Sequence, residues 1–303
     1  MLNLPQVVHN VLNHKKNILI AAIGGGYDIF AALPLIYTLT EMGSKVYLSS
    51  YSLKSNTHGY FCIETTPDII EGEYYPEKYL YRYLQKQKGF KDIPLKVSRK
   101  AGVMEMKEYY KRIMSMWPID VIVTIDGGVD SLMHGTEKHC GTVMEEFINF
   151  AALRDINKPM IHSCIGMGAE AEEGIEEHVV FQRISELAQD YAFLGSCSLT
   201  RGMESYKFYR RGYEDSIANA TLESHIHPRI IGSVEGGLIE STSNTSRTLM
   251  RATDTHLHLS PLMSIQWFFD GREVIKRNPF MGEMQNHMTI LDTLNMIQSI
   301  PRT

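Results

Sequence analysis

The sequence predicts an α/β protein built on a doubly wound, mostly parallel, Rossmann-like sheet. Apolar runs without polar alternation occur at 17–23, 119–125 and 160–164, the pattern of strands buried on both faces. Segments with helical spacing separate such runs from residue 16 to about residue 211. Regular alternation of this kind favours parallel strands with helices packed on both faces of the sheet.

Composition is ordinary for a folded chain of this length, with 303 residues, 44% hydrophobic and 21% charged. We expect a single α/β domain over 1–303, in which residues 213–303 form a less regular C-terminal elaboration. The net charge of −5 argues against nucleic-acid binding. No signal-peptide pattern or run of about 20 apolar residues occurs, so we expect a cytoplasmic location without membrane contact.

The first part of the chain begins with a helix, followed by a strand that opens into a glycine-rich turn and a second helix. A second strand then completes a βαβ unit. The polar, turn-rich stretch after it has the length of a lid or binding loop. In order, these segments are expected at 4–13, 17–23, 24–42, 45–50 and 51–75.

The middle of the chain continues the alternation, starting with a helix that has Pro76 at its first position. Helices are expected at 76–88, 102–116, 142–156, 176–189 and 199–211, and strands at 93–97, 119–125, 160–164 and 191–195. Residues 256–275 are expected to form a hairpin or strand pair with Asp270-Gly271 at the turn, and 288–300 a closing helix.

The first glycine-rich turn contains Gly24, Gly25 and Gly26, followed by Asp28. A strand, turn and helix in this order direct backbone N–H groups towards an anion beyond the strand. The turn lacks the third glycine of G-x-G-x-x-G, and the strand at 45–50 does not end in an acid for a ribose, so no NAD is expected. Asp28 either caps its helix or reaches a ligand hydroxyl. The alternative is a tight turn that needs glycine only for packing.

Three strands end in loops that combine glycine with a carboxylate: GGGYD, DGGVDS and GMGAE. Because the carboxyl ends of parallel strands meet on one edge, where such folds bind ligands, we expect a single pocket. Besides the first loop and the carboxylates, the residues expected to contact the ligand are Gly127, Gly128, Ser131, Gly166 and Gly168.

The carboxylates of these loops are the candidate catalytic residues, namely Asp126, Asp130 and Glu170. Asp126, Asp130 and Glu137 are the candidate ligands of a metal ion such as Mg²⁺, because hard cations prefer carboxylate oxygens. A metal-free acid/base pair is the alternative. In a purely structural interpretation Asp126 and Asp130 are turn and helix-cap residues.

Several segments together resemble the uncharacterised DUF1152 family: GGGYDIFAALPL, DGGVDSLMHGTE with GTVMEEF, GMGAE, SIANATLESHIHPRIIGSVEG and LSPLMSIQWFFD. The resemblance covers most of the chain and implies a Rossmann-like α/β fold, but it supplies no activity or catalytic residues. The third loop departs from the G-x-D-G-E pattern expected for the family. The missing aspartate weakens any metal site that depends on that loop.

These observations favour an enzyme that acts on a phosphorylated or nucleotide-like small molecule by hydrolysis or group transfer, with metal assistance. The expected ligand is a small anion, a nucleotide or a sugar phosphate. A non-catalytic binding or sensor protein that uses the same pocket is the first alternative. The second is an oligomeric scaffold, since the sequence leaves a homo-oligomer open.

Overall fold

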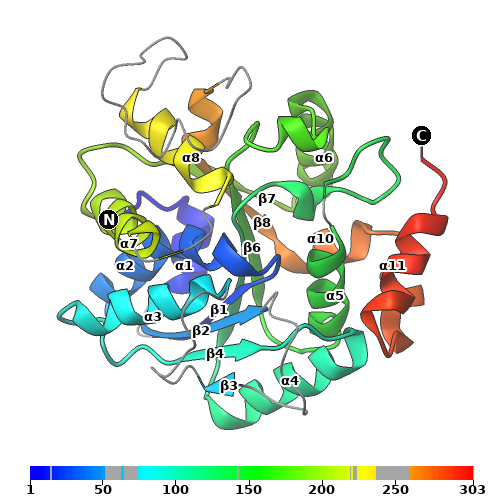
Figure 1. The fold of residues 1–303 in the computed structure, drawn as a ribbon, viewed down its shortest axis with the longest axis horizontal. Coiled ribbons are helices and arrows are strands. Elements are labelled where there is room, and N and C mark those ends of the chain that lie inside the picture. Colours follow the sequence, from blue (N-terminus) through cyan, green and yellow to red (C-terminus); the bar gives the residue numbers. More distant parts are fainter. Residues whose placement is uncertain are drawn as a thin grey trace.

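A computed structural model of the chain describes residues 1–13, 16–51, 63–64, 74–141, 143–218, 220, 224–236 and 259–302. An eight-stranded sheet lies at its centre, with strand order β3-β4-β2-β1-β5-β6-β8-β7, and helices cover both faces (Figure 1). The predicted α/β fold is therefore confirmed. The strands are β1 Asn17–Ala22, β2 Lys45–Tyr51, β3 Ile63–Glu64, β4 Leu95–Ser98, β5 Val121–Asp126, β6 Met160–Ile165, β7 Phe193–Ser198 and β8 Ile265–Asp270.

The sheet is mostly parallel, as predicted. Strands β4, β2, β1, β5 and β6 pair in parallel, whereas β3 is antiparallel to β4. Strand β8 lies between β6 and β7 and is antiparallel to both. The region after residue 213 therefore contributes a strand to the sheet itself.

The described helices follow the predicted alternation, and each element expected between residues 16 and 211, apart from the stretch 51–75, has a counterpart within a few residues. Most of 51–75 lies outside the described residues. None of the helices in the described ranges is long and apolar enough to cross a membrane. The α-helices are α1 Gln6–Leu12, α2 Leu33–Glu41, α3 Pro76–Lys86, α4 Val103–Met116, α5 Met144–Leu153, α6 Glu177–Gln189, α7 Glu204–Ile217, α8 Ile226–Glu235, α10 Gly271–Arg277 and α11 Ile290–Ser299. The 3₁₀ turns are η1 Gly26–Ala32, η2 Asp130–Leu132, η3 Ala171–Glu173, η4 Pro261–Ser264 and η5 Glu283–Asn286.

The apolar run of β1 is buried on both faces. Ile18 and Ile20 pack into a core with residues of α1, α2, α3 and α7. Leu19 and Ala21 pack into a second core with residues of α4, α5, α6 and α10. Figure 1 shows these two groups of helices on opposite sides of the sheet. Because successive side chains of a strand point to opposite faces, both faces must be apolar here, which is the pattern that the sequence displays.

The chain changes direction across the sheet at β1. It continues from β1 to β2 and β4 on one side, then returns through α4 to β5 on the other side of β1. The last residue of β1, Ala22, lies opposite Ser50 of β2 and Ile125 of β5. In doubly wound sheets the crevice at such a switch point is where ligands bind. The loops that follow β1 and β5 border it.

The predicted hairpin within 256–275 is wrong for the described residues of that stretch. One strand, β8, leads directly into α10, and residues 256–258 lie outside the described residues. The Asp270 side chain accepts hydrogen bonds from the backbone N–H groups of Arg272, at 2.8 Å, and Glu273, at 3.4 Å. Asp-Gly is a common pair in turns, but here Asp270 is the N-cap of α10 and Gly271 is its first residue.

Replacing Asp270 by alanine is expected to lower the free energy of unfolding by about 1 kcal/mol, because the first N–H groups of α10 lose their acceptor. Urea denaturation followed by circular dichroism measures the change. Asp155→Ala, at an exposed aspartate, provides the matched control. A variant as stable as the wild-type protein would contradict the capping role.

Candidate functional site

The loops after β1 and β5 lie against each other at the switch point. A Cβ built on Gly24 would overlap the carboxylates of Asp28 and Glu146. A Cβ on Gly127 would lie 3.0 Å from the Cα atom of Asp28. Glycine is therefore needed at both positions because other groups approach the backbone closely. Two of the three predicted loops are in direct contact.

The loop after β6 joins them through Glu170. Its Oε2 atom accepts a hydrogen bond of 2.6 Å from the backbone N–H of Val129, and a Cβ on Gly128 would lie 2.5 Å from its Oε1. A Cβ on Gly166 would lie 3.6 Å from the carbonyl oxygen of Gly127. All three glycine-bearing loops thus meet at one place on the carboxyl edge of the sheet.

Three carboxylates form the centre of this place. One oxygen each of Asp28, Asp126 and Glu146 lie within 4.8 Å of one another. Asp126 and Glu146 are buried, with exposed fractions of 1% and 3%, while Asp28 and Gly24 are half-buried and give the group its contact with solvent. The Oε2 atom of Glu146 has no hydrogen-bond partner among the described residues.

Glu146 reaches the edge because α5 is fixed to the end of β1. The side-chain amide of Asn149 donates a hydrogen bond of 2.7 Å to the carbonyl oxygen of Ile23 and accepts one of 2.7 Å from the Tyr110 hydroxyl. The sequence interpretation did not include Glu146. A signal was present, since a pair of glutamates lies in a helix whose other residues, apart from Asn149, are all apolar, so that the helix must be buried.

Asp126 is held in position by a buried hydrogen-bonded chain. Its Oδ1 accepts from the N–H of Gly128 at 2.7 Å, and its Oδ2 accepts from the Ser131 hydroxyl. The same hydroxyl lies 3.0 Å from Nε2 of His162, whose Nδ1 lies 3.0 Å from the Thr124 hydroxyl. Burial lowers the pKa of His162 to about 3, so the imidazole is neutral. His162 was missed because a single histidine in an apolar strand is not a distinctive motif.

Replacing Ser131 by alanine is expected to reduce the free energy of unfolding by about 1–3 kcal/mol, because Asp126 loses a donor and His162 loses its Nε2 partner inside the protein. Urea denaturation gives the difference. Ser115→Ala, at an exposed serine near the end of α4, is the matched control. Equal losses in the two variants would contradict the proposed role of the chain.

The site is strongly acidic and poorly solvated. Burial raises the pKa of Asp28 and Glu146 well above the ordinary values, and the charges of Asp126 and Asp130 raise both further. Burial likewise raises the pKa of Asp126, although the hydrogen bonds from Ser131 and Gly128 act in the opposite direction. Burial also raises the pKa of Glu145 and Glu170. Such a group holds protons or binds a cation at neutral pH.

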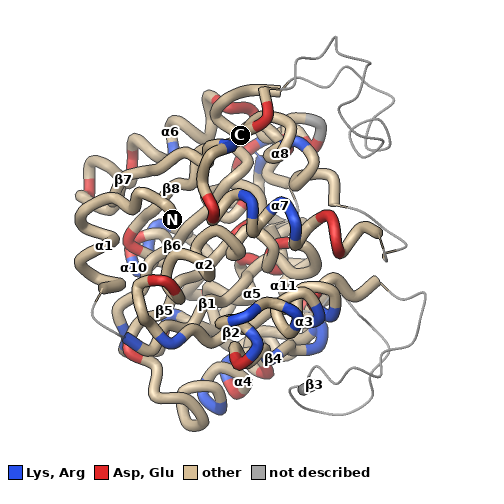
Figure 2. The backbone as a smooth tube through the Cα atoms, turned by 90° about the vertical axis from the view of Figure 1, so that its left-hand side faces the viewer, with Lys and Arg blue, Asp and Glu red and all other residues tan. Residues whose placement is uncertain are grey.

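The charge distribution of this acidic site differs from that of the protein surface. On the side seen in Figure 2, basic and acidic residues are interspersed along the helices. At the site, by contrast, the described ion pairs include Lys100, with Nζ 3.9 Å from an oxygen of Glu145, and the buried Arg229 donates a hydrogen bond to the carbonyl oxygen of Ala169, next to Glu170. The buried carboxyl groups of the site outnumber these two basic residues.

Two of the predicted residues serve other purposes. Glu137 accepts hydrogen bonds from the N–H groups of His134, at 2.9 Å, and Gly135, at 2.8 Å, and pairs with Arg183 at 3.0 Å. Its oxygens stabilise their own turn, and it is not part of the group of three carboxylates, so its prediction as a metal ligand gains no support. Gly168 packs against α6, since a Cβ there would lie 2.6 Å from an oxygen of Glu177.

Gly25 and Gly26 form the turn between β1 and η1. Their φ angles of 95° and 61° lie in the region that favours glycine. A Cβ on Gly26 would lie 2.5 Å from the Tyr74 hydroxyl oxygen. The turn therefore requires glycine for its own conformation, whether or not its N–H groups contact a ligand.

The three carboxylates fit a divalent cation. Oxygen ligands suit Mg²⁺, and two ligands of an octahedral magnesium ion lie about 4.2 Å apart when opposite and about 3.0 Å apart when adjacent, from a bond length of about 2.1 Å. Oxygens of Asp28, Asp126 and Glu146 lie within 4.8 Å of one another, so they would move closer together to bind one ion. The partnerless oxygen of Glu146 would gain a partner.

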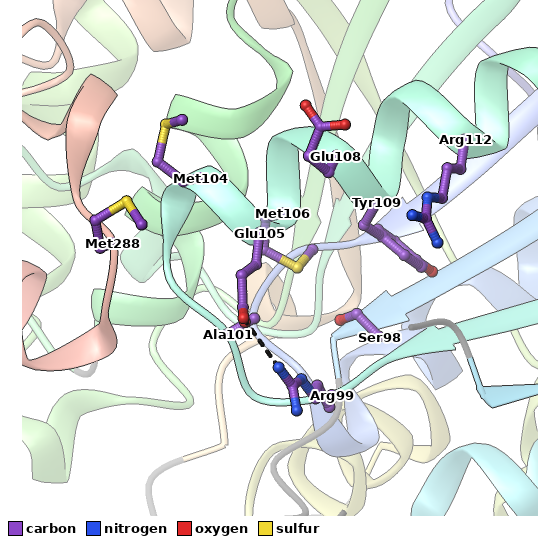
Figure 3. A pocket seen from close by; sticks show the side chains of 10 residues that line it. All are labelled: Ser98, Arg99, Ala101, Met104, Glu105, Met106, Glu108, Tyr109, Arg112 and Met288. Carbon is purple, nitrogen blue, oxygen red and sulfur yellow. Dashed lines mark hydrogen bonds and ion pairs between the residues drawn. The ribbon is translucent and has the colours of Figure 1, made fainter. Parts of the chain in front are cut away.

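A cavity of about 270 Å³ lies between the end of β4 and α4, on the face of the sheet that α4 covers (Figure 3). Its walls come mainly from α4, with Met104, Met106 and Met288 among the lining residues. At one side Arg99 forms an ion pair of 2.9 Å with Glu105. The mixture of apolar walls and a charged pair is suited to a planar or apolar ligand group.

Comparison with known proteins gives one match. The model of a family described as "Protein of unknown function (DUF1152)" matches residues 75–300. No curated protein and no solved structure matches the chain.

Proposed function

Because the chain belongs to the DUF1152 family, whose description names no function, we propose an activity from the site itself. The protein is an enzyme that acts on a phosphorylated or nucleotide-like small molecule by hydrolysis or group transfer, assisted by Mg²⁺. The observation that supports this proposal is the group of Asp28, Asp126 and Glu146 at the switch point of the sheet.

The acidity of the site is the reason to include a cation. Several buried carboxylates repel an anionic ligand as well as one another, so a phosphate needs a cation between itself and the protein. Magnesium sites commonly use one or two carboxylates together with substrate phosphates. The earlier prediction that the N–H groups of Gly24 to Gly26 hold the anion stays a prediction, because the carboxylates of Asp28 and Glu146 lie directly over Gly24.

When bound, the cation neutralises phosphate charge and polarises the bond that breaks. The residues of the chain position the reactants. Asp126 is oriented by Ser131 and, with Asp28 and Glu146, would hold the cation. Glu170, which accepts the N–H of Val129, and Asp130 are the groups we assign to proton transfer, as general acid or base. Water as the acceptor gives hydrolysis, and a second hydroxyl gives group transfer.

The test uses purified, chelator-treated protein. We expect Mg²⁺ to raise the melting temperature and a phosphorylated ligand to raise it further only when Mg²⁺ is present. A panel of nucleotides and sugar phosphates identifies the ligand by thermal shift, and ³¹P NMR then detects conversion. Asp126→Asn should abolish conversion, whereas the control Asp155→Asn, at an exposed aspartate, should not.

Two outcomes would contradict the proposal. Binding of a phosphorylated ligand without conversion by the wild-type protein would favour the sensor function instead. A protein that responds neither to Mg²⁺ nor to any phosphorylated compound would leave the scaffold alternative.

A further inference from the structure

The buried carboxyl group of Glu77 lies beside the end of β2, although β2 itself does not end in an acidic residue. Glu77 is the second residue of α3, yet its Oε1 accepts a hydrogen bond of 3.1 Å from the hydroxyl of Ser50 in β2. Ser50 lies opposite Ala22, the last residue of β1. The carboxyl group of Glu77 is therefore level with the start of the first glycine loop.

The second oxygen of Glu77 is buried without a side-chain partner. The side chain is 1% exposed, and Oε2 makes no hydrogen bond of good geometry among the described residues, although the backbone N–H groups of Glu77 and Gly26 lie close to the carboxyl group. A buried polar atom without a partner destabilises the folded state, so such an atom needs a reason to persist. The charge of Glu77 contributes to the raised pKa of Asp28, which shows that the two carboxyl groups share one electrostatic environment.

We propose that Glu77 and Ser50 bind the vicinal hydroxyls of a ribose, and that the ligand of the site is a ribonucleoside phosphate. With its proton on Oε2, Glu77 donates to one hydroxyl, and Oγ of Ser50, which donates to Oε1, accepts from the other. This inference rests on the proposed function, since the cation site would hold the phosphate.

The position agrees with the general plan of doubly wound folds. An acid at the end of the second strand binds ribose hydroxyls there, about 20 residues after the glycine turn. In this chain the acid comes from the helix that follows, 53 residues after Gly24 (77 − 24). A search for an acid at the usual spacing therefore does not find Glu77, although the fold brings its carboxyl group to the end of the second strand.

The cavity of Figure 3 lies beside the end of β4, on the face of the sheet that α4 covers, whereas Glu77 reaches Ser50 from α3 on the opposite face. Ser98 lines the cavity and donates a hydrogen bond of 3.4 Å to the carbonyl oxygen of Ser50. Strands β1, β2 and β4 are neighbours, so the ends of β1 and β4 lie about 10 Å apart. A base that enters this cavity would therefore have to cross the carboxyl edge of the sheet from the ribose.

The test measures affinity in excess Mg²⁺ for the 5′-diphosphates of adenosine, guanosine, cytidine and uridine, their 2′-deoxy counterparts and ribose 5-phosphate. We expect the best ribonucleotide to bind at least about tenfold more tightly than its deoxy form, because a site built around a hydroxyl discriminates against its loss. It should also bind more tightly than ribose 5-phosphate.

Two variants test whether Glu77 and Ser50 cause the preference for ribonucleotides over deoxyribonucleotides. Glu77→Met keeps an unbranched side chain of similar length and removes the carboxyl group, and Ser50→Ala removes the hydroxyl with little change of volume. Each should reduce the ratio of ribo to deoxy affinity to less than about twofold. The melting-temperature rise caused by Mg²⁺ alone should persist, since Asp28, Asp126 and Glu146 are intact.

The outcomes separate this inference from the proposed function. Equal wild-type affinity for ribo and deoxy ligands would overturn the ribose site and leave the proposed function standing. Ribose 5-phosphate binding as tightly as any nucleotide would overturn the assignment of a nucleoside. No binding of any phosphorylated probe in Mg²⁺ would overturn both the inference and the proposed function.

Discussion

Replacing Glu146 by glutamine is expected to make the cation-free protein more stable and to remove its stabilisation by Mg²⁺. Burial and the charges of Asp130 and Asp126 raise the pKa of Glu146, so the charged form is unfavourable in the folded protein. A neutral amide of the same shape removes that repulsion, which we expect to add on the order of 1–2 kcal/mol to the free energy of unfolding. The cation at the same time loses one of its three carboxylates.

The measurement compares urea denaturation of wild type and variant with chelator and with Mg²⁺. At a concentration 100 times its dissociation constant, a ligand stabilises the folded state by about 2.7 kcal/mol, so wild type should gain about that amount and Glu146→Gln almost nothing. Glu204→Gln, at an exposed glutamate paired with Lys207, is the control and should behave like wild type. If Glu146→Gln is less stable without cation and responds normally to Mg²⁺, the carboxylate has a structural role instead.

The strands could be predicted from local pattern because burial on both faces leaves a direct mark on the sequence. The runs at β1, β5 and β6 are mostly apolar and do not alternate with exposed polar residues, and each lies in the interior of the sheet. Strand β8 could not be predicted in the same way. Its place between β6 and β7 depends on long-range pairing, and its Asp-Gly end is compatible with both a turn and a helix cap.

The site could be predicted only in part, for a related reason. Asp126 and Glu170 follow strands that end on the same edge, so parallel pairing alone brings them together. Glu146 lies on α5 and Glu77 lies on α3. Their distance from the strand ends therefore depends on how those helices pack against the sheet. The hydrogen bonds of Asn149 to Ile23 and of Ser50 to Glu77 fix that packing, and sequence spacing does not reveal such contacts.

Glu77 also provides a large pH effect. Burial raises its pKa to about 8 from an ordinary value of 4.5, although the hydrogen bond from Ser50 and the backbone of Gly26 act in the opposite direction. Between those two pH values the folded protein keeps a proton on Glu77 that the unfolded chain has released. The free energy of unfolding therefore falls as pH rises from about 5 to 8, by up to about 5 kcal/mol, since each pKa unit corresponds to about 1.4 kcal/mol.

Glu77→Gln should remove this contribution, because an amide does not titrate. Other buried acids, among them Asp28, shift stability in the same direction, so the informative quantity is the difference in free energy of unfolding between variant and wild type at each pH. Urea denaturation at pH values from 5 to 9 should show that difference increasing in favour of the variant by several kcal/mol, on the order set by the pKa shift. A difference that stays constant with pH would mean that Glu77 does not keep its proton in the folded protein. The exposed Glu283→Gln serves as the control and should give a flat difference near zero.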